Sequence, residues 1–326
     1  MCCQLYNACL ERIVRKRLYL RRQSRQAVYH LSGRIKKTQL HSDCLAGQVV
    51  AAFGRHYSVA TEAGIVSCVT RGKKIGVACG DQVTCRLTTP GQGVIETIQP
   101  RRSLFYRSDA FKEKIIAANV TQIILVVAAV PSFSEELISR CLVAAESENI
   151  NVLIVLNKSD LIEQTKIAYQ TLSLYRDLGY CVLQLSSIHD VSLLLPYLTN
   201  HLSVLVGQSG MGKSTLLNAL VPEANRSTAT ISLALDSGSH TTTYSQLYQL
   251  DKNSAIIDSP GFQEFGLNHI KEENLAYGFA EFHPYIGHCK FSNCRHRAEP
   301  GCAVLAAHED GKILSKRLDY YHKLLR

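Results

Sequence analysis

Residues 207–214 carry a phosphate-binding pattern. They match G-x-x-x-x-G-K-[ST] at every fixed position, and they stand between an apolar run at 202–206 and a helical pattern that starts at Lys213. In this strand–loop–helix context, the glycines let backbone N–H groups turn toward a β-phosphate. We expect Lys213 to neutralise charge on the β- and γ-phosphate oxygens and the Ser214 hydroxyl to ligate Mg²⁺. The residues predicted to contact the nucleotide here are Gly207, Gln208, Ser209, Gly210, Met211, Gly212, Lys213, Ser214 and Thr215.

A second motif, Asn157-Lys158-Ser159-Asp160, indicates which base is bound, and it follows the apolar run NVLIVL. Asp160 can accept hydrogen bonds from the N1–H and N2 amine of guanine, whereas adenine offers neither donor there. Lys158 can lie along the base and Asn157 can tie the loop to its neighbours, although the tetrapeptide alone also fits an Asx-type turn. Ser186 and Ser187 end the next apolar run and fit the backbone-donor position of a guanine pocket. The combination predicts GTP or GDP rather than ATP.

The two motifs stand in an unusual order. The guanine motif begins at residue 157, and the phosphate loop begins about fifty positions later, at residue 207. In ordinary GTP-binding domains the phosphate loop comes first. The reversed order indicates a circularly permuted GTPase domain.

Two later segments predict contacts to Mg²⁺ and the γ-phosphate. Asp258 and Gly261 belong to a D-S-P-G run after an apolar strand, so the carboxylate can hold Mg²⁺ through water and the glycine N–H can bind the γ-phosphate. Alone, D-x-P-G is a common turn. Thr241 and Thr242 lie in a run of three threonines that offers hydroxyl and N–H groups to Mg²⁺ and the γ-phosphate. A plain solvated loop is the other interpretation of that run.

The residue that would orient the attacking water is unusual. Many small GTPases place a glutamine directly after D-x-x-G, and in this chain that position is Phe262, which cannot orient water. Hydrolysis should therefore be slow unless another residue or a partner assists. His240, directly before the threonines, is the candidate catalytic residue, and an ordinary loop histidine is the alternative interpretation.

Three cysteines and a histidine cluster near the end of the sequence. Their spacing is Cys289-x4-Cys294-x-His296-x5-Cys302. Three sulfurs and one nitrogen suit tetrahedral Zn²⁺, and four protein ligands leave no open position, so we predict one structural zinc ion. Coincidental clustering of reduced cysteines is the alternative.

The overall pattern predicts a multidomain protein in four parts. Residues 1–45 form a basic arm that we expect to be disordered, 46–100 an oligonucleotide-binding (OB)-like β-barrel, 101–269 the permuted α/β GTPase domain and 270–326 a helical zinc-binding domain. Short alternating runs with frequent glycines indicate the barrel, with an unspecialised barrel or sandwich as the alternative. Continuous apolar runs separated by helical segments indicate a parallel sheet covered on both faces.

Charge and composition bear on partners and compartment. Residues 11–37 hold ten Lys and Arg beside the single acid Glu11, so this stretch alone accounts for the net charge of +9 of the 326-residue chain. Such a run is either a solvated arm or an arm that binds nucleic acid. We expect no secretory signal and no membrane span, since the longest apolar run is far too short. Twelve cysteines, mostly scattered singly in apolar segments, fit a reducing cytosol with one metal cluster.

Together these motifs resemble the RsgA (YjeQ) family, the circularly permuted bacterial GTPases that depend on the ribosomal small subunit. The resemblance covers roughly residues 47–326 and rests on NKSD before GQSGMGKST, then SHTTT, DSPGF and CKFSNCRHRAEPGCAV. It implies an OB barrel, a permuted GTPase and a zinc module. It also implies that the histidine before the threonines, His240 here, assists hydrolysis.

We therefore expect a cytoplasmic GTPase that binds the small ribosomal subunit and its rRNA and acts in late maturation of that subunit. Hydrolysis of GTP to GDP and phosphate would be stimulated by the subunit, with Mg²⁺ bound beside GTP. We expect a monomer with no membrane partner. One alternative is an RNA-binding module that uses nucleotide only for stability, as Phe262 would allow. Another is an ATP-dependent P-loop enzyme, against which Asp160 argues.

Overall fold

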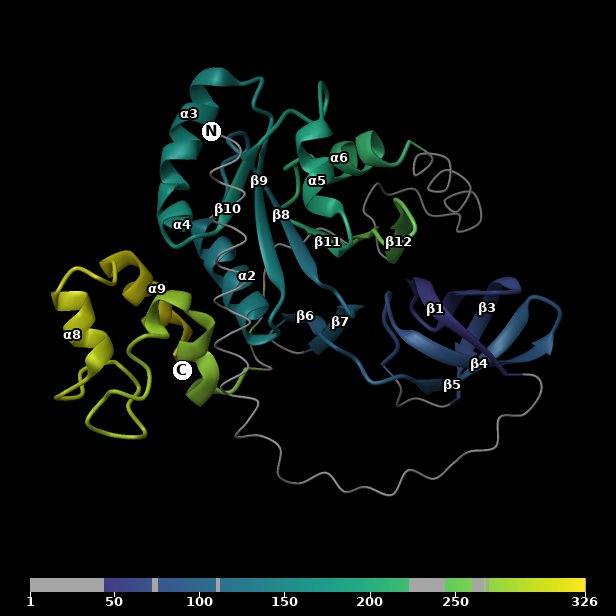
Figure 1. Ribbon diagram of the computed structural model, residues 1–326, viewed down its shortest axis with the longest axis horizontal. Helices are drawn as coiled ribbons and strands as arrows, with labels where there is room; N and C mark the ends of the chain where they lie inside the picture. The colour runs from purple at the N-terminus through teal and green to yellow at the C-terminus, as the bar shows by residue number, and fades with distance from the viewer. Residues whose placement is uncertain are drawn as a thin grey trace.

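The computed structural model describes residues 44–71, 76–109, 112–222, 244–259, 267 and 270–325. Figure 1 shows three parts along the longest axis: a β-barrel, a central sheet flanked by helices, and a helical module that ends the chain. The basic arm predicted at 1–45 lies outside the described residues except for its last two positions.

The barrel has the strand order of an OB fold. Its strands are β1 (Cys44–Phe53), β2 (His56–Thr61), β3 (Gly64–Thr70), β4 (Gln82–Thr89) and β5 (Gln92–Ile98). They are hydrogen-bonded in the order β1-β2-β3-β5-β4, and β4 pairs back with β1 to close the barrel. Alternate residues point inward, so Val59, Val66 and Ile95 are among the side chains that fill its core. The prediction of an OB-like barrel is confirmed.

The central sheet is mostly parallel, as the continuous apolar runs predict. Its strands are β8 (Gln122–Ala128), β9 (Asn151–Asn157), β10 (Cys181–Gln184), β11 (Leu202–Val206), β12 (Ser245–Gln249) and β13 (Ala255–Asp258). They lie in the order β10-β9-β8-β11-β13-β12, and β12 is antiparallel to β13. Every residue of β8 is buried, because helices cover both faces of the sheet.

Each face of the sheet has its own set of helices. One face packs against α2 (Glu135–Ser147), α3 (Ile162–Thr171) and α4 (Ser173–Asp177). The other packs against the short helices η1 (Ser192–Leu194) and α5 (Leu195–Leu198) and against α6 (Lys213–Leu220). Successive residues of β8 alternate between these two cores: Ile123 and Leu125 face α2, whereas Ile124 and Val126 face α5 and α6.

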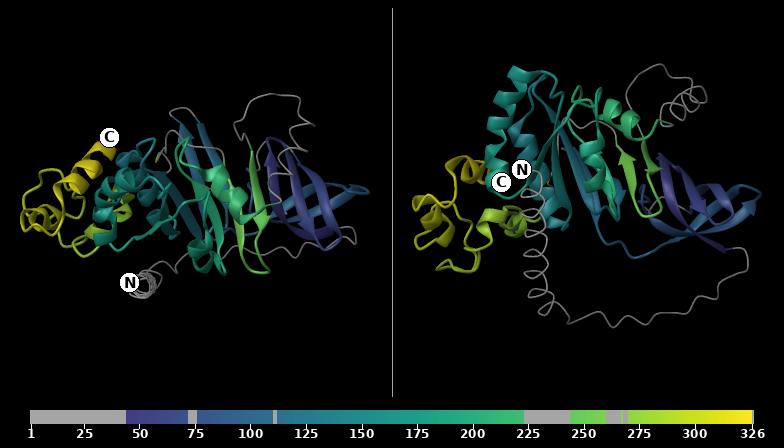
Figure 2. Two further views of the ribbon diagram at one scale, coloured as in Figure 1. Left: turned by 90° about the horizontal axis from the view of Figure 1, so that it is seen from above. Right: turned by 45° about the horizontal axis from the view of Figure 1, so that its top comes forward.

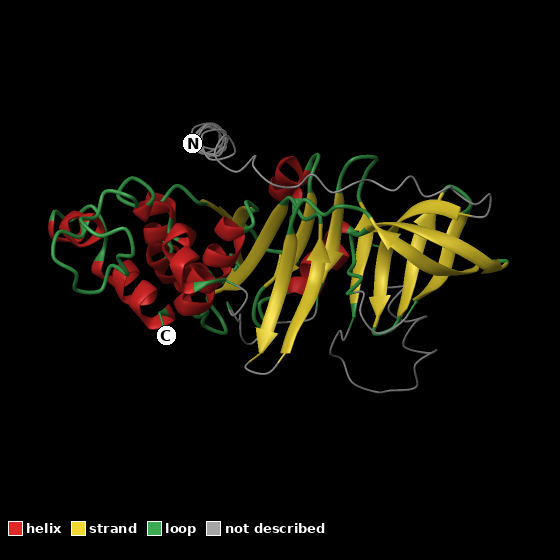
Figure 3. Cartoon of the chain, turned by 90° about the horizontal axis from the view of Figure 1, so that it is seen from below, coloured by secondary structure: helices red, strands yellow, loops and turns green. Residues whose placement is uncertain are grey.

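The barrel and the central sheet are joined through their hydrogen bonds. β4 pairs with β1 over residues 44–48 of β1. Farther along the same edge of β1, β12 pairs in its place, with Ala51 opposite Gln246 and Ala52 opposite Ser245. The rings of Phe53 and Tyr244 lie 4.7 Å apart next to this pairing. Figures 2 and 3 show the strands of both parts side by side in one continuous, twisted array.

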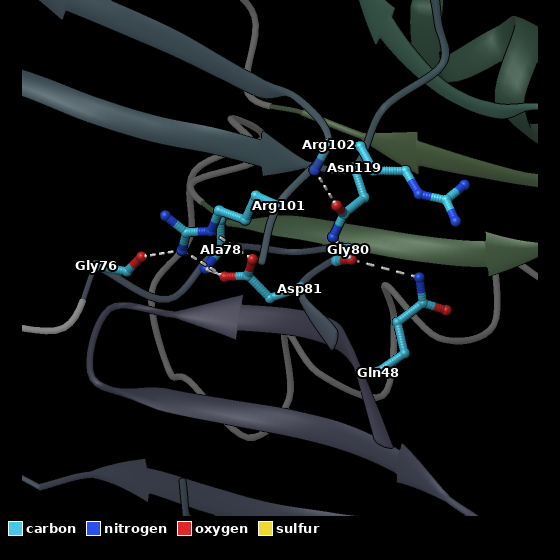
Figure 4. Close-up of polar contacts among 8 residues, drawn as sticks. All are labelled: Gln48, Gly76, Ala78, Gly80, Asp81, Arg101, Arg102 and Asn119. Carbon is cyan, nitrogen blue, oxygen red and sulfur yellow. Dashed lines mark hydrogen bonds and ion pairs between the residues drawn. The ribbon is translucent and has the colours of Figure 1, made fainter. Parts of the chain in front are cut away.

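A polar cluster fixes the chain where it leaves the barrel (Figure 4). Asp81 is fully buried, and Arg101 donates to both of its carboxylate oxygens at 2.7 Å. The N–H of Ala78 also donates to Asp81, at 2.8 Å. Asn119 bridges the same region by donating to the carbonyl of Gly80 at 3.0 Å and accepting from the N–H of Arg102 at 2.9 Å. The hairpin of β6 (Leu104–Asp109) and β7 (Lys112–Ala118) lies between Arg102 and Asn119.

The C-terminal module is helical and has its own aromatic core. It contains the 3₁₀ helices η2 (Glu272–Gly278) and η3 (Ala280–Phe282) and the helices α8 (Ala303–Glu309) and α9 (Ser315–Leu324). Phe279, Phe282 and Tyr321 pack together at its centre, with ring centroids 5.0–5.4 Å apart. Among the described residues, no helix is long and apolar enough to cross a bilayer.

We predict that Arg101→Ala destabilises the protein by on the order of 3 kcal/mol, because it leaves the buried Asp81 carboxylate without its cation. The matched control is Arg71→Ala, which breaks an exposed pair with Glu96 and should cost less than about 1 kcal/mol. Urea unfolding followed by far-UV circular dichroism measures both. Equal losses in the two variants would contradict a structural role for the Asp81–Arg101 pair.

Candidate functional site

The predicted nucleotide residues gather at one edge of the central sheet. β8, β9, β10, β11 and β13 are parallel, so their carboxyl ends meet at this edge. Asn157 ends β9, Ser186 follows β10, Gly207 follows β11 and Asp258 ends β13. In open α/β sheets, ligands bind in the crevice outside the carboxyl ends of the strands. The topology therefore places both motifs where a nucleotide site is expected, despite their reversed order.

The loop glycines occupy positions that other residues could not. Gly207 and Gly212 have φ angles of +151° and +90°, which side chains disfavour. A Cβ on Gly207 would lie 2.3 Å from the carbonyl oxygen of Val126, and one on Gly212 would lie 2.3 Å from Nδ2 of Asn157. Helix α6 begins directly after Gly212, so its N-terminal N–H groups face the loop.

Lys213 and Asp258 form the charged centre of the site. The ammonium of Lys213 donates to the carbonyl oxygens of Gly207 and Gln208, at 2.7 and 2.9 Å. Burial lowers the pKa of Lys213, and the nearby Asp258 carboxylate opposes that effect. Burial raises the pKa of Asp258 to about 6, while Lys213 and the N–H of Ser259 oppose the rise. A carboxylate held this way gains from a cation, which fits the expected Mg²⁺.

Asn157 joins the guanine motif to the phosphate loop. Its side chain is fully buried; Nδ2 donates to the carbonyl of Met211 at 3.0 Å, and Oδ1 accepts from the N–H of Ser187 at 3.0 Å. Lys158 adds a second link, because its ammonium donates to the carbonyls of Gly210 and Val130, both at 2.7 Å. The two motifs are thus in direct contact, although they lie about fifty positions apart in the chain.

Asp160 is presented as an ionised acceptor. Its side chain is exposed, and the Ser186 hydroxyl donates to Oδ1 at 2.5 Å. This hydrogen bond lowers the pKa of Asp160. The sequence suggests a backbone-donor role for Ser186, and in the structure its hydroxyl also orients the carboxylate. Ser159 anchors the turn, since its N–H donates to the carbonyl of Leu185 at 3.2 Å.

The remaining predicted residues are only partly covered. Ser209, Ser214 and Thr215 are exposed on the loop and the first turn of α6. The candidate catalytic residue His240 and the predicted γ-phosphate contacts Thr241, Thr242 and Gly261 lie outside the described residues.

Sequence reasoning missed one contact of the phosphate loop. Oε1 of Gln208 accepts from the backbone N–H of Ser134 at 2.9 Å. Ser134 is the N-cap of α2, and its own hydroxyl accepts from the N–H of Leu137 at 3.3 Å. A serine followed by two glutamates and an apolar pattern is a helix-start signal that could have located this cap. Nothing in the sequence indicates that the cap meets Gln208.

The four predicted metal ligands converge in the C-terminal module. The ligand atoms of Cys289, Cys294, His296 and Cys302 all lie within 4.8 Å of one another. Nδ1 of His296 is 3.5 Å from Sγ of Cys289 and 3.3 Å from Sγ of Cys302, and those sulfurs are 3.9 Å apart. Tetrahedral Zn²⁺ with its usual bond lengths needs ligand–ligand edges of roughly 3.5–3.8 Å. The donor set and its spacing are therefore compatible with zinc.

Neighbouring residues hold this metal loop in shape. His296 has a φ of +56°, and its carbonyl accepts from Nε2 of His322 at 2.7 Å. The Tyr321 hydroxyl donates to the carbonyl of Arg295 at 2.9 Å. Glu299 accepts from the N–H groups of Arg295 and Arg297, both at 2.8 Å. Such outer contacts orient metal ligands.

The chain is similar to known proteins of one family. The family model described as RsgA GTPase matches residues 98–268. A Nitrosospira multiformis protein named Small ribosomal subunit biogenesis GTPase RsgA is 60% identical over 282 residues, covering 86% of this chain and 90% of the relative. A Nitrosomonas europaea protein of the same name is 57% identical over 286 residues, covering 86% and 91%.

Two solved structures share the fold over most of their length. YjeQ from Thermotoga maritima is 31% identical with a TM-score of 0.66, covering 86% of this chain and 97% of that one. YloQ, described as a circularly permuted GTPase, is 31% identical with a TM-score of 0.64, covering 88% and 96%. These likenesses confirm the predicted fold class of barrel, permuted GTPase and C-terminal module.

We predict that Asp258 makes the nucleotide-free, Mg²⁺-free protein less stable as the pH rises. In the folded state the pKa of Asp258 is raised to about 6, above its ordinary value, so the folded protein holds this proton to a higher pH than the unfolded chain does. The resulting stabilisation is present below pH 4 and is lost as the pH rises through 6. Relative to Asp258→Asn, the wild type should lose about 2–3 kcal/mol between pH 4 and pH 7. Urea unfolding across this range measures it, and a difference independent of pH would contradict the burial argument.

Proposed function

The chain belongs to the RsgA GTPase family, and we propose from this premise that it hydrolyses GTP to GDP and phosphate in the biogenesis of the small ribosomal subunit. The observation that carries the proposal is the Asn157 side chain, which hydrogen-bonds both the phosphate loop and the Ser186–Ser187 turn. Because both the nitrogen and the oxygen of this buried amide are hydrogen-bonded, the amide fixes the distance between the guanine end and the phosphate end of the site. That fixed distance suits a whole nucleotide rather than phosphate alone, and the Asp160 carboxylate favours guanine as its base.

Each predicted site residue has a proposed role in binding or in hydrolysis. Asp160 would accept from guanine, and the loop N–H groups with Lys213 would bind the phosphates. Ser214 and, through water, Asp258 would hold Mg²⁺, which neutralises charge on the phosphate oxygens. Thr241, Thr242 and Gly261 are the proposed γ-phosphate contacts. A water attacks the γ-phosphorus, the bond to the β-phosphate oxygen breaks, and GDP leaves with inorganic phosphate.

His240 is the proposed residue that assists this attack, because Phe262 has no group that could orient water. Without a glutamine at position 262, the unaided rate of hydrolysis should be low. The proposal therefore includes stimulation by the small subunit, which would complete the site on binding.

We propose the same four-part division for the functions. The arm (1–45) and the barrel (46–100) would bind rRNA, the permuted domain (101–269) would bind nucleotide, and the C-terminal part (270–326) would bind one structural Zn²⁺ through Cys289, Cys294, His296 and Cys302. The partners would be the small subunit with its rRNA and GTP or GDP. The chain would work as a monomer in the bacterial cytoplasm, without a membrane partner.

GTP hydrolysis with and without purified small subunits tests the proposed function. We expect clear stimulation by the subunits, and a loss of about 10²-fold or more in stimulated kcat/KM for Lys213→Ala, since the variant removes the phosphate-binding cation. Lys166→Ala removes an exposed lysine of α3 and serves as the matched control. Excess ATP should not displace labelled GTP. Hydrolysis that neither responds to subunits nor falls in Lys213→Ala would favour a nucleotide-stabilised RNA-binding module.

Metal analysis tests the proposed zinc site. We expect one zinc per chain by mass spectrometry, and we expect Cys294→Ser to lose the metal and lower the unfolding temperature, since metal binding is coupled to folding in such modules. Cys181→Ser changes a half-buried thiol at the sheet edge and should retain the zinc. Full zinc content in Cys294→Ser would refute this ligand set.

A further inference from the structure

The phosphate loop is hydrogen-bonded to the start of α2 through Gln208, at a position of the motif that can be any residue. The backbone N–H of Ser134 would be one of the unpaired donors at a helix start, and it donates to Oε1 of Gln208 at 2.9 Å. The backbone carbonyl of the same Gln208 accepts from Lys213 at 2.9 Å. Gln208 therefore contacts the phosphate-binding lysine through its main chain and α2 through its side chain.

The face of α2 that points away from the central sheet packs against the C-terminal module (Figure 1). Nη1 of Arg317 donates to the Ser139 hydroxyl at 3.1 Å, and the ammonium of Lys316 donates to Glu135 at 2.7 Å. Gly278 lies against the middle of α2, where a Cβ would stand 3.1 Å from Cα of Val143. The helix is thus packed between the sheet and the module.

Arg317 is the central residue of this interface. It is fully buried, its Nε donates to Glu281 at 2.5 Å, and its guanidinium lies 4.7 Å from the centroid of Phe279. A buried cation with three kinds of partner is costly to displace, so α9 and α2 should move together.

The same helix α9 supports the metal loop. Tyr321 packs edge-on against Phe279 and donates to the carbonyl of Arg295, and His322 donates to the carbonyl of His296. Direct contacts therefore run from Lys213 through Gln208, Ser134, α2 and α9 to the backbone that carries a proposed zinc ligand.

We propose that Gln208 is a positioning residue that couples nucleotide binding at the phosphate loop to the C-terminal module through α2. This inference rests on the proposed nucleotide binding. Phosphate oxygens compete with the carbonyls of Gly207 and Gln208 for the N–H groups of Lys213, so occupancy of the loop changes the contacts of Gln208. Because Gln208 holds the cap of α2, the change reaches α9, and by linkage a ligand on the module alters nucleotide affinity by the same factor.

Hydrogen exchange of the full-length, zinc-loaded protein tests the coupling without ribosomal subunits. Amide exchange is compared without nucleotide, with saturating GDP and with a saturating non-hydrolysable GTP analogue. In the wild type we expect nucleotide to change exchange in α9 (Ser315–Leu324) by about fivefold or more, alongside protection of the phosphate loop.

Three variants locate the route. Gln208→Met keeps the length of the side chain but removes the acceptor, so the response of α9 should largely disappear while protection of the loop persists at saturation. Ser139→Ala removes the hydrogen bond from Arg317 but keeps the Lys316–Glu135 pair, so it should weaken the response of α9 without abolishing it. Ser134→Ala is the matched control, because it removes the capping hydroxyl but keeps the backbone N–H that donates to Gln208. Its α9 response should remain.

The outcomes separate this inference from the proposed function. If nucleotide protects the loop and leaves α9 unchanged in the wild type, the coupling is overturned and nucleotide binding stands. If Gln208→Met retains the full response, the role of Gln208 is overturned and the coupling takes another route. If nucleotide fails to protect even the loop, the proposed nucleotide binding fails and the inference fails with it.

Discussion

The buried amide of Asn157 is the interaction on which the rest of the site depends. It bonds the Met211 carbonyl on one side and the Ser187 N–H on the other, and Gly212 leaves the space that it occupies. A hydrogen bond depends on where two groups lie and not on which comes first in the chain. The circular permutation can therefore reverse the motif order while the geometry between base and phosphate sites is kept.

Around this contact, the parts of the molecule are held as a connected body. β12 pairs with the part of the β1 edge that β4 does not cover. The Asp81–Arg101 pair fixes the chain as it leaves the barrel. On the other side, Arg317 fills the interface between α2 and the C-terminal module. The nucleotide edge of the sheet thus lies between two flanking parts that are each attached by buried polar contacts or ladder hydrogen bonds.

The sequence predicts best where local chemistry dictates residue type. Gly207 and Gly212 need positive φ angles and close approach, and the zinc-type ligands need a short spacing, so both sites could be located from the chain alone. The Gln208–Ser134 and Arg317–Ser139 contacts join residues 74 and 178 positions apart. No periodicity or motif marks such pairs, because they arise only when separate elements pack. The β1–β12 pairing escaped prediction for the same reason.

That pairing has a consequence for how the protein is synthesised. Residues 51 and 52 of β1 pair with β12, whose residues leave the ribosome about 190 positions later. At translation rates of about 5–20 residues per second, β1 is synthesised roughly 10–40 s before β12, and part of its edge is unpaired during that time. Unpaired edges invite pairing with other chains. The register shift between Val49 and Ala51 bends this part of β1. A bent edge pairs less well with a strand of another chain.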